Sequence, residues 1–145
     1  MRTYVFDIDG TVSNADRRKH YLDRIPKDWD AFFDEQHLDE PHEHIVEILR
    51  MLYVAGNHIV FATGRREDSR GITTAWLRKN GIPFEALYMR ATDDRRDDSV
   101  IKIEQLEKIR ADSYDVVAWF EDRNRVVNAL RAAGVKVLHV ADGDF

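Results

Sequence analysis

The sequence predicts a three-layer α/β fold, with an open parallel sheet of about five strands covered by helices on both faces. Two observations predict it. Short apolar runs alternate with amphipathic helical segments along most of the chain, and parallel strands that are joined through helices become buried on both faces. The 145 residues are 43% hydrophobic and 34% charged, which is typical of a globular protein, so we expect residues 1–145 to form one Rossmann-like domain.

The composition excludes several classes of protein. No apolar run reaches the length of a membrane span, and the absence of cysteine excludes a disulfide framework and thiolate metal sites. The first strand begins almost at Met1 and leaves no room for a signal peptide, so we expect a cytoplasmic protein without membrane partners. The net charge of −5 argues against bulk binding of nucleic acid, although it is compatible with a local basic patch.

The first strand ends at residue 6 and is followed at once by two carboxylates. Asp7 and Asp9 flank Ile8, Gly10 turns the chain, and Thr11 offers a hydroxyl. A lone Asp-x-Asp is most often a polar turn after a strand. Burying both carboxylates, however, is unfavourable unless a divalent cation or a cation-bound phosphate compensates their charge. A calcium loop is excluded because the glycine comes too early and no bidentate Glu follows.

Residues 13–40 interrupt the alternation, and we interpret them as an insertion that covers the end of the first strand. The segment is rich in charged and aromatic residues and lacks clean periodicity, although residues 28–33 fit a short helix. Trp29, Phe32 and Phe33 could stack on a nucleic-acid base. Such a cluster serves more often as the small core of the segment that carries it.

After the insertion, helices and strands alternate to the end of the chain. Apolar residues at helical spacing mark the helices, with Ile72 and Val100 on two apolar sides, and Gly56 and Gly134 end two helices. Pro41 is expected at the first position of its helix. The predicted helices span residues 41–53, 68–79, 99–109 and 124–133, and the later strands span 58–62, 84–89, 116–120 and 136–140.

Polar residues follow four of the strands, at the edge where parallel sheets bind ligands. Besides the aspartates after the first strand, they are Thr63-Gly64-Arg65 after the second, Lys102 early in the helix after the third, and Glu121-Asp122 after the fourth. Phosphoryl transfer needs an in-line nucleophile, a cation and fixed positive charge around the phosphoryl oxygens. A carboxylate, Mg²⁺, Lys102 and Arg65 would supply these, so the sequence predicts a phosphoryl-transfer site.

This set of residues resembles the four motifs of the haloacid dehalogenase superfamily of phosphatases. The resemblance implies Asp7 as the nucleophile and Asp9 as the general acid, and later base, of an aspartyl-phosphate mechanism. It also implies that Thr63 holds a phosphate oxygen and that Lys102 restrains Asp7. The implied Mg²⁺ ligands are Asp7, the Ile8 carbonyl, Asp9 and Asp122. Glu121 stands where an aspartate is more usual, so its contact with the metal could be direct or through water.

Over nearly the whole chain, the sequence resembles more closely the 3′-phosphatase domain of phage polynucleotide kinase. The residues that carry it are Asp7 to Thr11, Arg18, Gly64-Arg65, Arg96-Asp97-Asp98, Lys102, Asp122-Arg123, Val126-Val127 and Gly143-Asp144-Phe145. The resemblance implies that Arg18 and Arg65, with Thr11, Thr63 and Gly64, contact the substrate phosphate and that Asp98 supports the site. No Gly-x-x-x-x-Gly-Lys-Ser/Thr loop occurs, so a 5′-kinase activity would require a separate protein.

The leading hypothesis is therefore a Mg²⁺-dependent phosphatase that removes 3′-phosphates from DNA or RNA ends during nucleic-acid repair, with a separate kinase or ligase as a partner. Residues 13–40 are too short for the large cap that often encloses small metabolites in this fold. Arg66, Arg70, Arg95 and Arg96 could meet the next phosphates of a strand. The alternatives are a small-molecule nucleotidase and a catalytically silent module that binds nucleic-acid ends.

Overall fold

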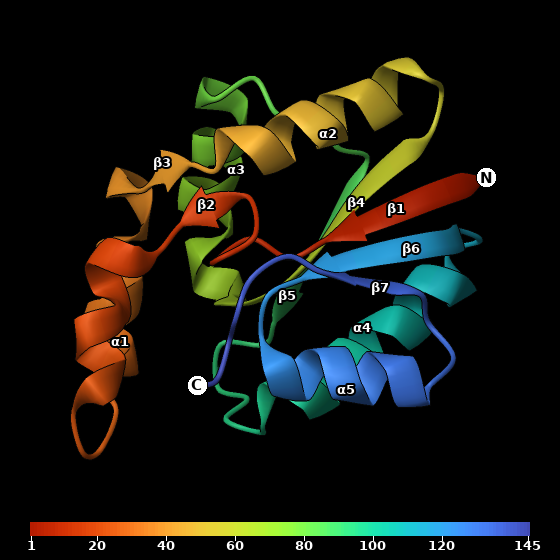
Figure 1. The fold of residues 1–145 in the computed structure, drawn as a ribbon. Coiled ribbons are helices and arrows are strands. Elements are labelled where there is room, and N and C mark those ends of the chain that lie inside the picture. Colours follow the sequence, from red (N-terminus) through yellow and green to blue (C-terminus); the bar gives the residue numbers. More distant parts are fainter.

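The computed structural model describes residues 1–145, and it confirms an α/β fold built on a five-stranded parallel sheet (Figure 1). The strand order is β5-β4-β1-β6-β7, so the first strand lies at the centre of the sheet. The strands are β1 (Arg2–Phe6), β4 (His58–Arg66), β5 (Ala86–Arg90), β6 (Asp115–Glu121) and β7 (Val137–His139). Both neighbours of β1 run parallel to it, which brings three carboxyl ends to one edge.

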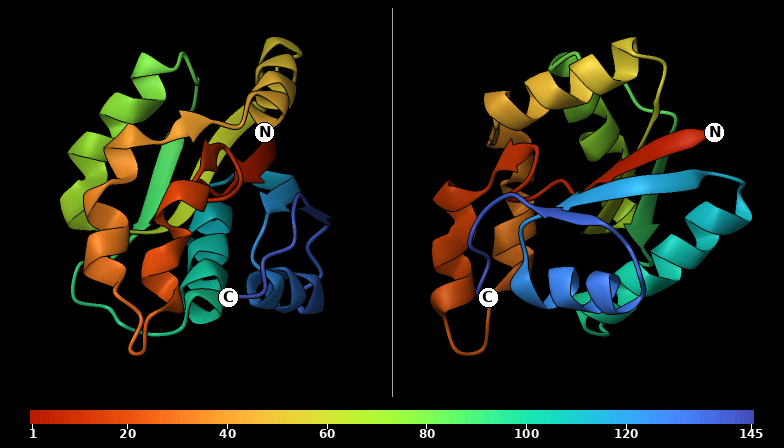
Figure 2. Two further views of the ribbon diagram at one scale, coloured as in Figure 1. Left: turned by 60° about the vertical axis from the view of Figure 1, so that its left-hand side comes forward. Right: turned by 45° about the vertical axis from the view of Figure 1, so that its right-hand side comes forward.

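Helices cover both faces of the sheet (Figures 1 and 2). Helices α2 (Glu43–Val54) and α3 (Arg70–Lys79) enclose the larger core cluster, in which Leu49 and Trp76 pack on Phe6 and Phe61. Helices α4 (Asp98–Ala111) and α5 (Asn124–Ala132) enclose the second cluster, around Trp119. Buried apolar side chains on both faces of β1 explain why its residues are all apolar just before Asp7.

The predicted elements are all present, and three details differ. Pro41 is not the first helical residue, because it pairs with Ser13 in a two-residue strand and α2 begins two residues later, at Glu43. Strand β4 continues past the predicted residue 62 to Arg66. Its pairing with β5 shifts register after Ala62 and resumes where Arg66 pairs with Arg90. Ile72 and Val100 are exposed by 48% and 43%, so they do not belong to the buried helix faces.

The insertion after β1 is a small unit closed at its base by two paired strands. Strands β2 (Ser13–Asn14) and β3 (Glu40–Pro41) run antiparallel, so the insertion leaves and rejoins the domain at one point. Between them lie the 3₁₀ helix η1 (Asp16–Asp23), helix α1 (Trp29–Asp34) and the 3₁₀ helix η2 (Gln36–Leu38). The carboxylate of Asp28 caps α1 by accepting a hydrogen bond from the Ala31 amide at 3.1 Å, as expected at a helix start.

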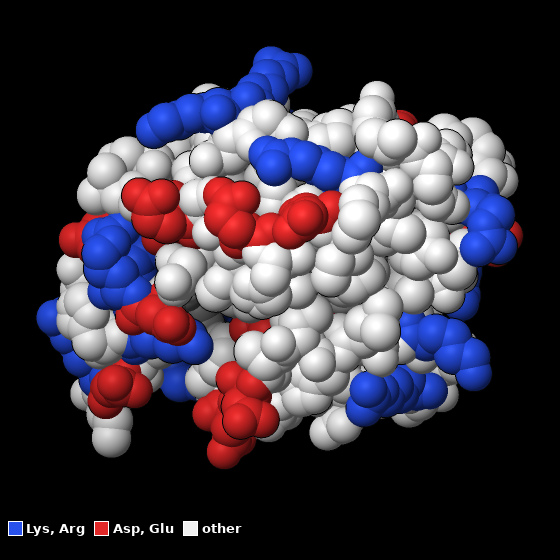
Figure 3. All heavy atoms as spheres, turned by 45° about the horizontal axis from the view of Figure 1, so that its top comes forward, with Lys and Arg blue, Asp and Glu red and all other residues white.

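The charged surface is mixed. On the face over α2, acidic and basic side chains stand among uncharged atoms and form no continuous basic track (Figure 3). A polyanion would therefore find no extended binding surface on this face. None of the helices combines the length and the apolar character needed to cross a membrane.

Candidate active site

The turn after β1 brings the first motif to the carboxyl edge of the sheet. The amide of Asp7 donates to the Phe120 carbonyl on β6 at 3.0 Å, which holds Asp7 beside the next strand end. Gly10 has φ of +82°, and a Cβ atom there would lie 2.1 Å from Oδ2 of Asp122. Glycine is therefore required at this position for two reasons, its backbone conformation and the close approach of the Asp122 carboxylate.

Three carboxylates and one ammonium form the carboxylate–lysine cluster, defined as Asp7, Glu121, Asp122 and Lys102. Ligand atoms of the three acids all lie within 4.8 Å of one another. Nζ of Lys102, which is fully buried, lies 3.0 Å from Asp7 Oδ1 and 2.8 Å from Glu121 Oε1. One positive charge faces three negative ones, so the cluster lacks two positive charges and fits a divalent cation bound by oxygen ligands.

This charge deficit shifts the pKa values of the cluster. Burial, followed by repulsion from neighbouring carboxylates, raises the pKa of Asp7 well above its usual range and that of Asp122 to about 8. Burial alone would lower the pKa of Lys102, but Asp7 and Glu121 raise it above the usual value. Lys102 therefore stays charged, while the acids bind protons unless another cation compensates them.

A second group, the arginine–aspartate quartet, consists of Asp9, Asp39, Arg18 and Arg65. Arg65 donates to Asp9 through Nε at 3.1 Å and Nη2 at 2.7 Å. Arg18 donates to Asp9 through Nη2 at 2.6 Å and to Asp39 through Nε at 2.9 Å. Two guanidinium groups thus neutralise two carboxylates. Although burial would raise the pKa of Asp9, Arg65 and Arg18 hold it well below its usual range.

The structure places the two predicted phosphate-binding arginines behind Asp9. The side chains of Arg18 and Arg65 are fully buried, and Nη1 of Arg18 also donates to the Phe32 carbonyl at 2.6 Å. In this state they hold the carboxylate of Asp9 and present no exposed surface to a substrate. Their contact with the phosphate stays a prediction, and it would require these ion pairs to rearrange.

Three other predicted residues face partners that the sequence did not indicate. The Thr11 hydroxyl is buried and donates to Asp122 Oδ1 at 3.3 Å, so it orients a carboxylate. Thr11 does not line the cavity of about 390 Å³ that opens over the site. The Ile8 carbonyl accepts amide hydrogen bonds from residues 11, 12 and 13, so it is used inside the turn. Asp9, assigned to the metal from the sequence, lies outside the acidic cluster and pairs with arginine instead.

The second motif lies at the end of β4. Gly64 lines the cavity described below, and its carbonyl accepts a hydrogen bond from Arg90 Nε at 3.1 Å. A Cβ atom at Gly64 would lie 2.5 Å from Asp98 Oδ1, so a glycine is needed for Asp98 to approach. The buried Thr63 hydroxyl accepts from the Arg65 amide at 3.1 Å and Thr63 does not line the cavity, so its contact with a phosphate stays a prediction.

Several supporting residues were missed from the sequence. Asp39, at the end of the insertion, has a fully buried side chain that also accepts from Ser13 Oγ at 3.0 Å. Arg90 and Arg123 lie 3.2 and 3.6 Å from the two oxygens of Asp98. No local spacing signals the contacts of Asp39 with Ser13 and of Arg123 with Asp98, because each joins segments that only the tertiary fold brings together.

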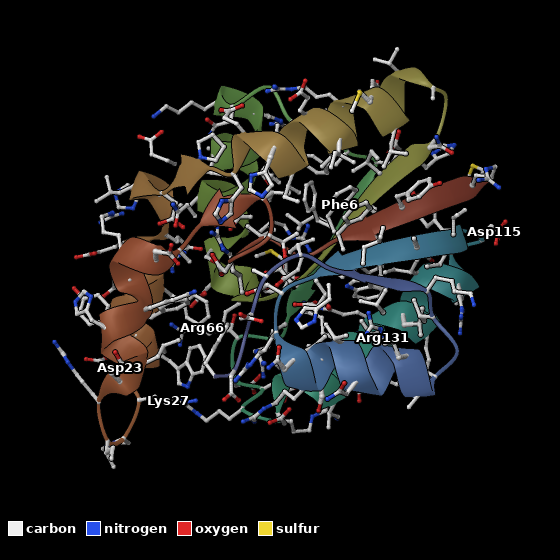
Figure 4. The ribbon with its side chains drawn as sticks, in the orientation of Figure 1. Phe6, Asp23, Lys27, Arg66, Asp115 and Arg131 are labelled. Atoms are coloured by element: carbon white, nitrogen blue, oxygen red, sulfur yellow. The ribbon has the colours of Figure 1, made fainter.

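A cavity of about 390 Å³ opens over the site. Asp7, Asp9 and Asp122 lie in its wall, with aromatic residues of the insertion and basic residues from four segments of the chain. Figure 4 shows Arg66 and Lys27 on the side of the insertion that faces the body of the domain. The predicted helix at residues 28–33 therefore contributes both to the core of the insertion, through Phe32, and to the cavity wall.

The basic residues around the cavity differ in how much of their charge is free. Arg96 pairs with Asp94 at 2.6 Å and with Glu104 at 2.6 Å, and Arg66 pairs with Asp30 at 3.1 Å. Arg95 is exposed, lines the cavity and makes no ion pair. Although the sequence treats Arg95 and Arg96 alike, only Arg95 has an uncompensated charge.

Comparison with known proteins gives a consistent result. The family model of the polynucleotide kinase PNKP phosphatase domain matches residues 1–145. A protein named as a bifunctional polynucleotide kinase/RNA ligase, from Autographa californica nuclear polyhedrosis virus, is 30% identical over 130 residues, which cover 87% of this chain and 17% of that protein. This chain therefore spans less than a fifth of that relative.

Solved structures agree. A chain in the structure of the Pnkp1/Rnl/Hen1 RNA repair complex has a TM-score of 0.86 and 28% identity, covering 99% of this chain and 43% of that one. The tungstate-bound class C acid phosphatase from Bacillus anthracis has a TM-score of 0.71 and 15% identity, covering 97% of this chain and 66% of that one. At that identity the second match shows the fold alone.

Proposed function

Because this chain belongs to the family of polynucleotide kinase phosphatase domains, of haloacid dehalogenase-like fold, we propose that it removes the 3′-phosphate from DNA or RNA ends. The observation that carries the proposal is the position of Asp7, which lies in the wall of an open cavity and contacts the charged Lys102. A carboxylate held beside a fixed ammonium can attack a phosphoryl group whose charge would otherwise repel it.

The proposed reaction has two steps. The carboxylate of Asp7 attacks phosphorus, the bond to the 3′-oxygen breaks, and the leaving oxygen takes a proton from Asp9, which leaves an aspartyl-phosphate. Water then attacks this phosphoryl group and gives its proton to Asp9, which releases phosphate and restores Asp7. Asp9 is ionised in the free protein, and the negative charge of the bound substrate would raise its pKa toward the acid role.

The carboxylate–lysine cluster fits Mg²⁺. Asp7 and Asp122 would hold the ion, and Glu121, which bonds to Lys102 and lies near the amides of residues 122 and 123, would support them. When bound, the ion would neutralise charge on the phosphoryl oxygens. Of the two peptide oxygens between Asp7 and Gly10, only that of Asp9 accepts no hydrogen bond within the chain, which makes it a better candidate ligand than the Ile8 carbonyl.

A small-molecule nucleotidase remains the alternative function, because a cavity of about 390 Å³ is near the lower end of the size range for small-ligand pockets. A silent binding module fits less well, since the protein has the nucleophile, the lysine and the acidic cluster. For partners, we propose a kinase or ligase that acts on the same ends, because relatives carry these names and one occurs in an RNA repair complex. We also propose a cytoplasmic location, in keeping with the absence of cysteine.

The deciding experiment compares phosphate release from a 3′-phosphorylated oligonucleotide, its 5′-phosphorylated counterpart and a 3′-mononucleotide, each with Mg²⁺ and with chelator. We expect the highest kcat/KM for the 3′-phosphorylated oligonucleotide and no release with chelator. Equal kcat/KM for the mononucleotide would favour the nucleotidase. An absence of turnover on all three substrates would favour the silent module.

A further inference from the structure

Part of the cavity wall is aromatic, although removal of a phosphate alone does not require aromatic side chains. Trp29, Phe32 and Phe33 of the insertion all line the cavity, together with Asp7 and Asp9. An apolar part of the wall therefore shares the cavity with the residues that would carry out the chemistry.

The three aromatic rings have different environments. Phe32 is 4% exposed, belongs to the small core of the insertion and stands nearly perpendicular to both other rings, at 86° and 74°. Trp29 and Phe33 are only partly buried, and their rings are 23° from parallel with centroids 5.9 Å apart. Phe32 thus fills the core, whereas Trp29 and Phe33 stack on each other and remain partly accessible.

Cationic groups surround this wall. Arg123 and Lys27 lie 5.7 and 5.9 Å from the centre of the Trp29 ring, and Arg66 lies 5.4 Å from that of Phe33. Lys27 is exposed and makes no ion pair, so it can leave the ring face without breaking another contact. Aromatic faces bordered by cations are the combination with which proteins bind single nucleotides of a nucleic-acid strand.

We propose that Trp29 and Phe33 form a stacking site for the base of the 3′-terminal nucleotide, so that the enzyme recognises the nucleotide that carries the scissile phosphate. The proposal rests on the proposed function. Stacking tolerates any base, because every base has a π-face, so the site would select for the presence of a base and not for its identity. Lys27, which makes no ion pair, would then accompany the sugar-phosphate backbone.

The test uses two 3′-phosphorylated oligonucleotides that differ only in the last nucleotide, which carries a base in one and an abasic tetrahydrofuran in the other. For the wild-type protein we expect kcat/KM to be about 5- to 150-fold higher with the base, the range for loss of one stacking contact. In Trp29→Leu and Phe33→Leu this ratio should fall toward one. Leucine keeps the side chain apolar, and thermal unfolding checks that each variant is folded.

Phe32→Leu is the matched control, because it changes the same cluster at the ring that fills the core. Whatever its effect on the absolute rate, it should leave the ratio at the wild-type value. Equal rates on both oligonucleotides in the wild-type protein would overturn the stacking site and leave the 3′-phosphatase intact. A ratio that persists in both Trp29→Leu and Phe33→Leu would also overturn it, and failure to hydrolyse either oligonucleotide would overturn the proposed function as well.

Discussion

Two clusters of carboxylates and cationic side chains lie beside the turn after β1, and they differ in charge balance. In the arginine–aspartate quartet, two guanidinium groups meet two carboxylates, and each carboxylate accepts more than one hydrogen bond. In the carboxylate–lysine cluster, one ammonium meets three carboxylates. The pKa of Asp9 is accordingly held low, whereas the pKa values of Asp7 and Asp122 are raised.

This difference separates two tasks that lie two residues apart in the sequence. The quartet is complete without a ligand, so it can hold Asp9 in one position before substrate arrives. The other cluster is complete only with a cation, so its stability and its chemistry depend on what it binds. Asp7 and Asp9 look equivalent in the sequence, and the tertiary partners of each residue make them different.

The largest expected effect on activity comes from removing Asp7, the proposed nucleophile of the carboxylate–lysine cluster. Asp7→Asn should lower kcat by about 10⁴-fold or more, because the amide cannot attack phosphorus. The same change removes one of three repelling charges, so the melting temperature in chelator should not fall. Turnover within tenfold of the wild-type rate would exclude Asp7 as the nucleophile.

Neutralising one acid in each cluster should affect the stability of the metal-free protein differently. Asp39→Asn leaves the buried Arg18 short of a counter-charge, and we expect a loss of about 3–5 kcal/mol in the free energy of unfolding. Asp122→Asn relieves repulsion and should leave the metal-free protein equally or more stable. Urea unfolding in chelator measures both, and a similar loss in the two variants would show that the charge balance of the clusters does not differ as described.

The unbalanced cluster also predicts a pH dependence of stability without metal. The pKa of Asp122 is about 8 in the folded protein and near 4 when unfolded, so between these values the folded state binds more protons. Stability is then highest at low pH within this window and falls as pH rises, by about 2 kcal/mol between pH 6 and 8. Unfolding curves in chelator should show this loss and curves in Mg²⁺ should not; stability that rises over this range in chelator would contradict the shift.

The smallest effect concerns the basic groups at the cavity. Arg95→Ala should raise KM for the oligonucleotide several-fold and reduce its salt dependence by about one charge, because Arg95 has no partner within the protein. Arg96→Ala is the matched control, since its charge is already paired with Asp94 and Glu104. Equal salt slopes in the two variants would contradict this distinction.

The fold was predictable because its signals are local. Apolar strands, helical spacing and helix-ending glycines fixed the order of elements, and the carboxyl ends of parallel strands then placed Asp7, Thr63 and Asp122 at one edge. The predicted start of α2 was wrong because Pro41 pairs with Ser13 in a short antiparallel ladder. This long-range pairing cannot be predicted from the local preference of proline for a helix start.

The site was predictable only in part. Which residues gather at the sheet edge follows from topology, but which partner each one takes does not. The buried carboxylate of Asp39 comes from the far end of the insertion, and it holds Arg18 in place behind Asp9. The Thr11 hydroxyl donates to Asp122, and the Ile8 carbonyl accepts hydrogen bonds within the turn. Such assignments depend on side-chain geometry within a few ångströms, which spacing along the chain does not specify.

Titration of the protein with Mg²⁺ by calorimetry tests the contrast between the two clusters most directly. Asp122→Asn should lose most of its affinity for Mg²⁺, because it removes a carboxylate from the cluster that lacks positive charge. Asp9→Asn should bind Mg²⁺ with nearly the wild-type affinity, because its carboxylate is already neutralised by Arg18 and Arg65. An equal loss of Mg²⁺ affinity in both variants would contradict the account.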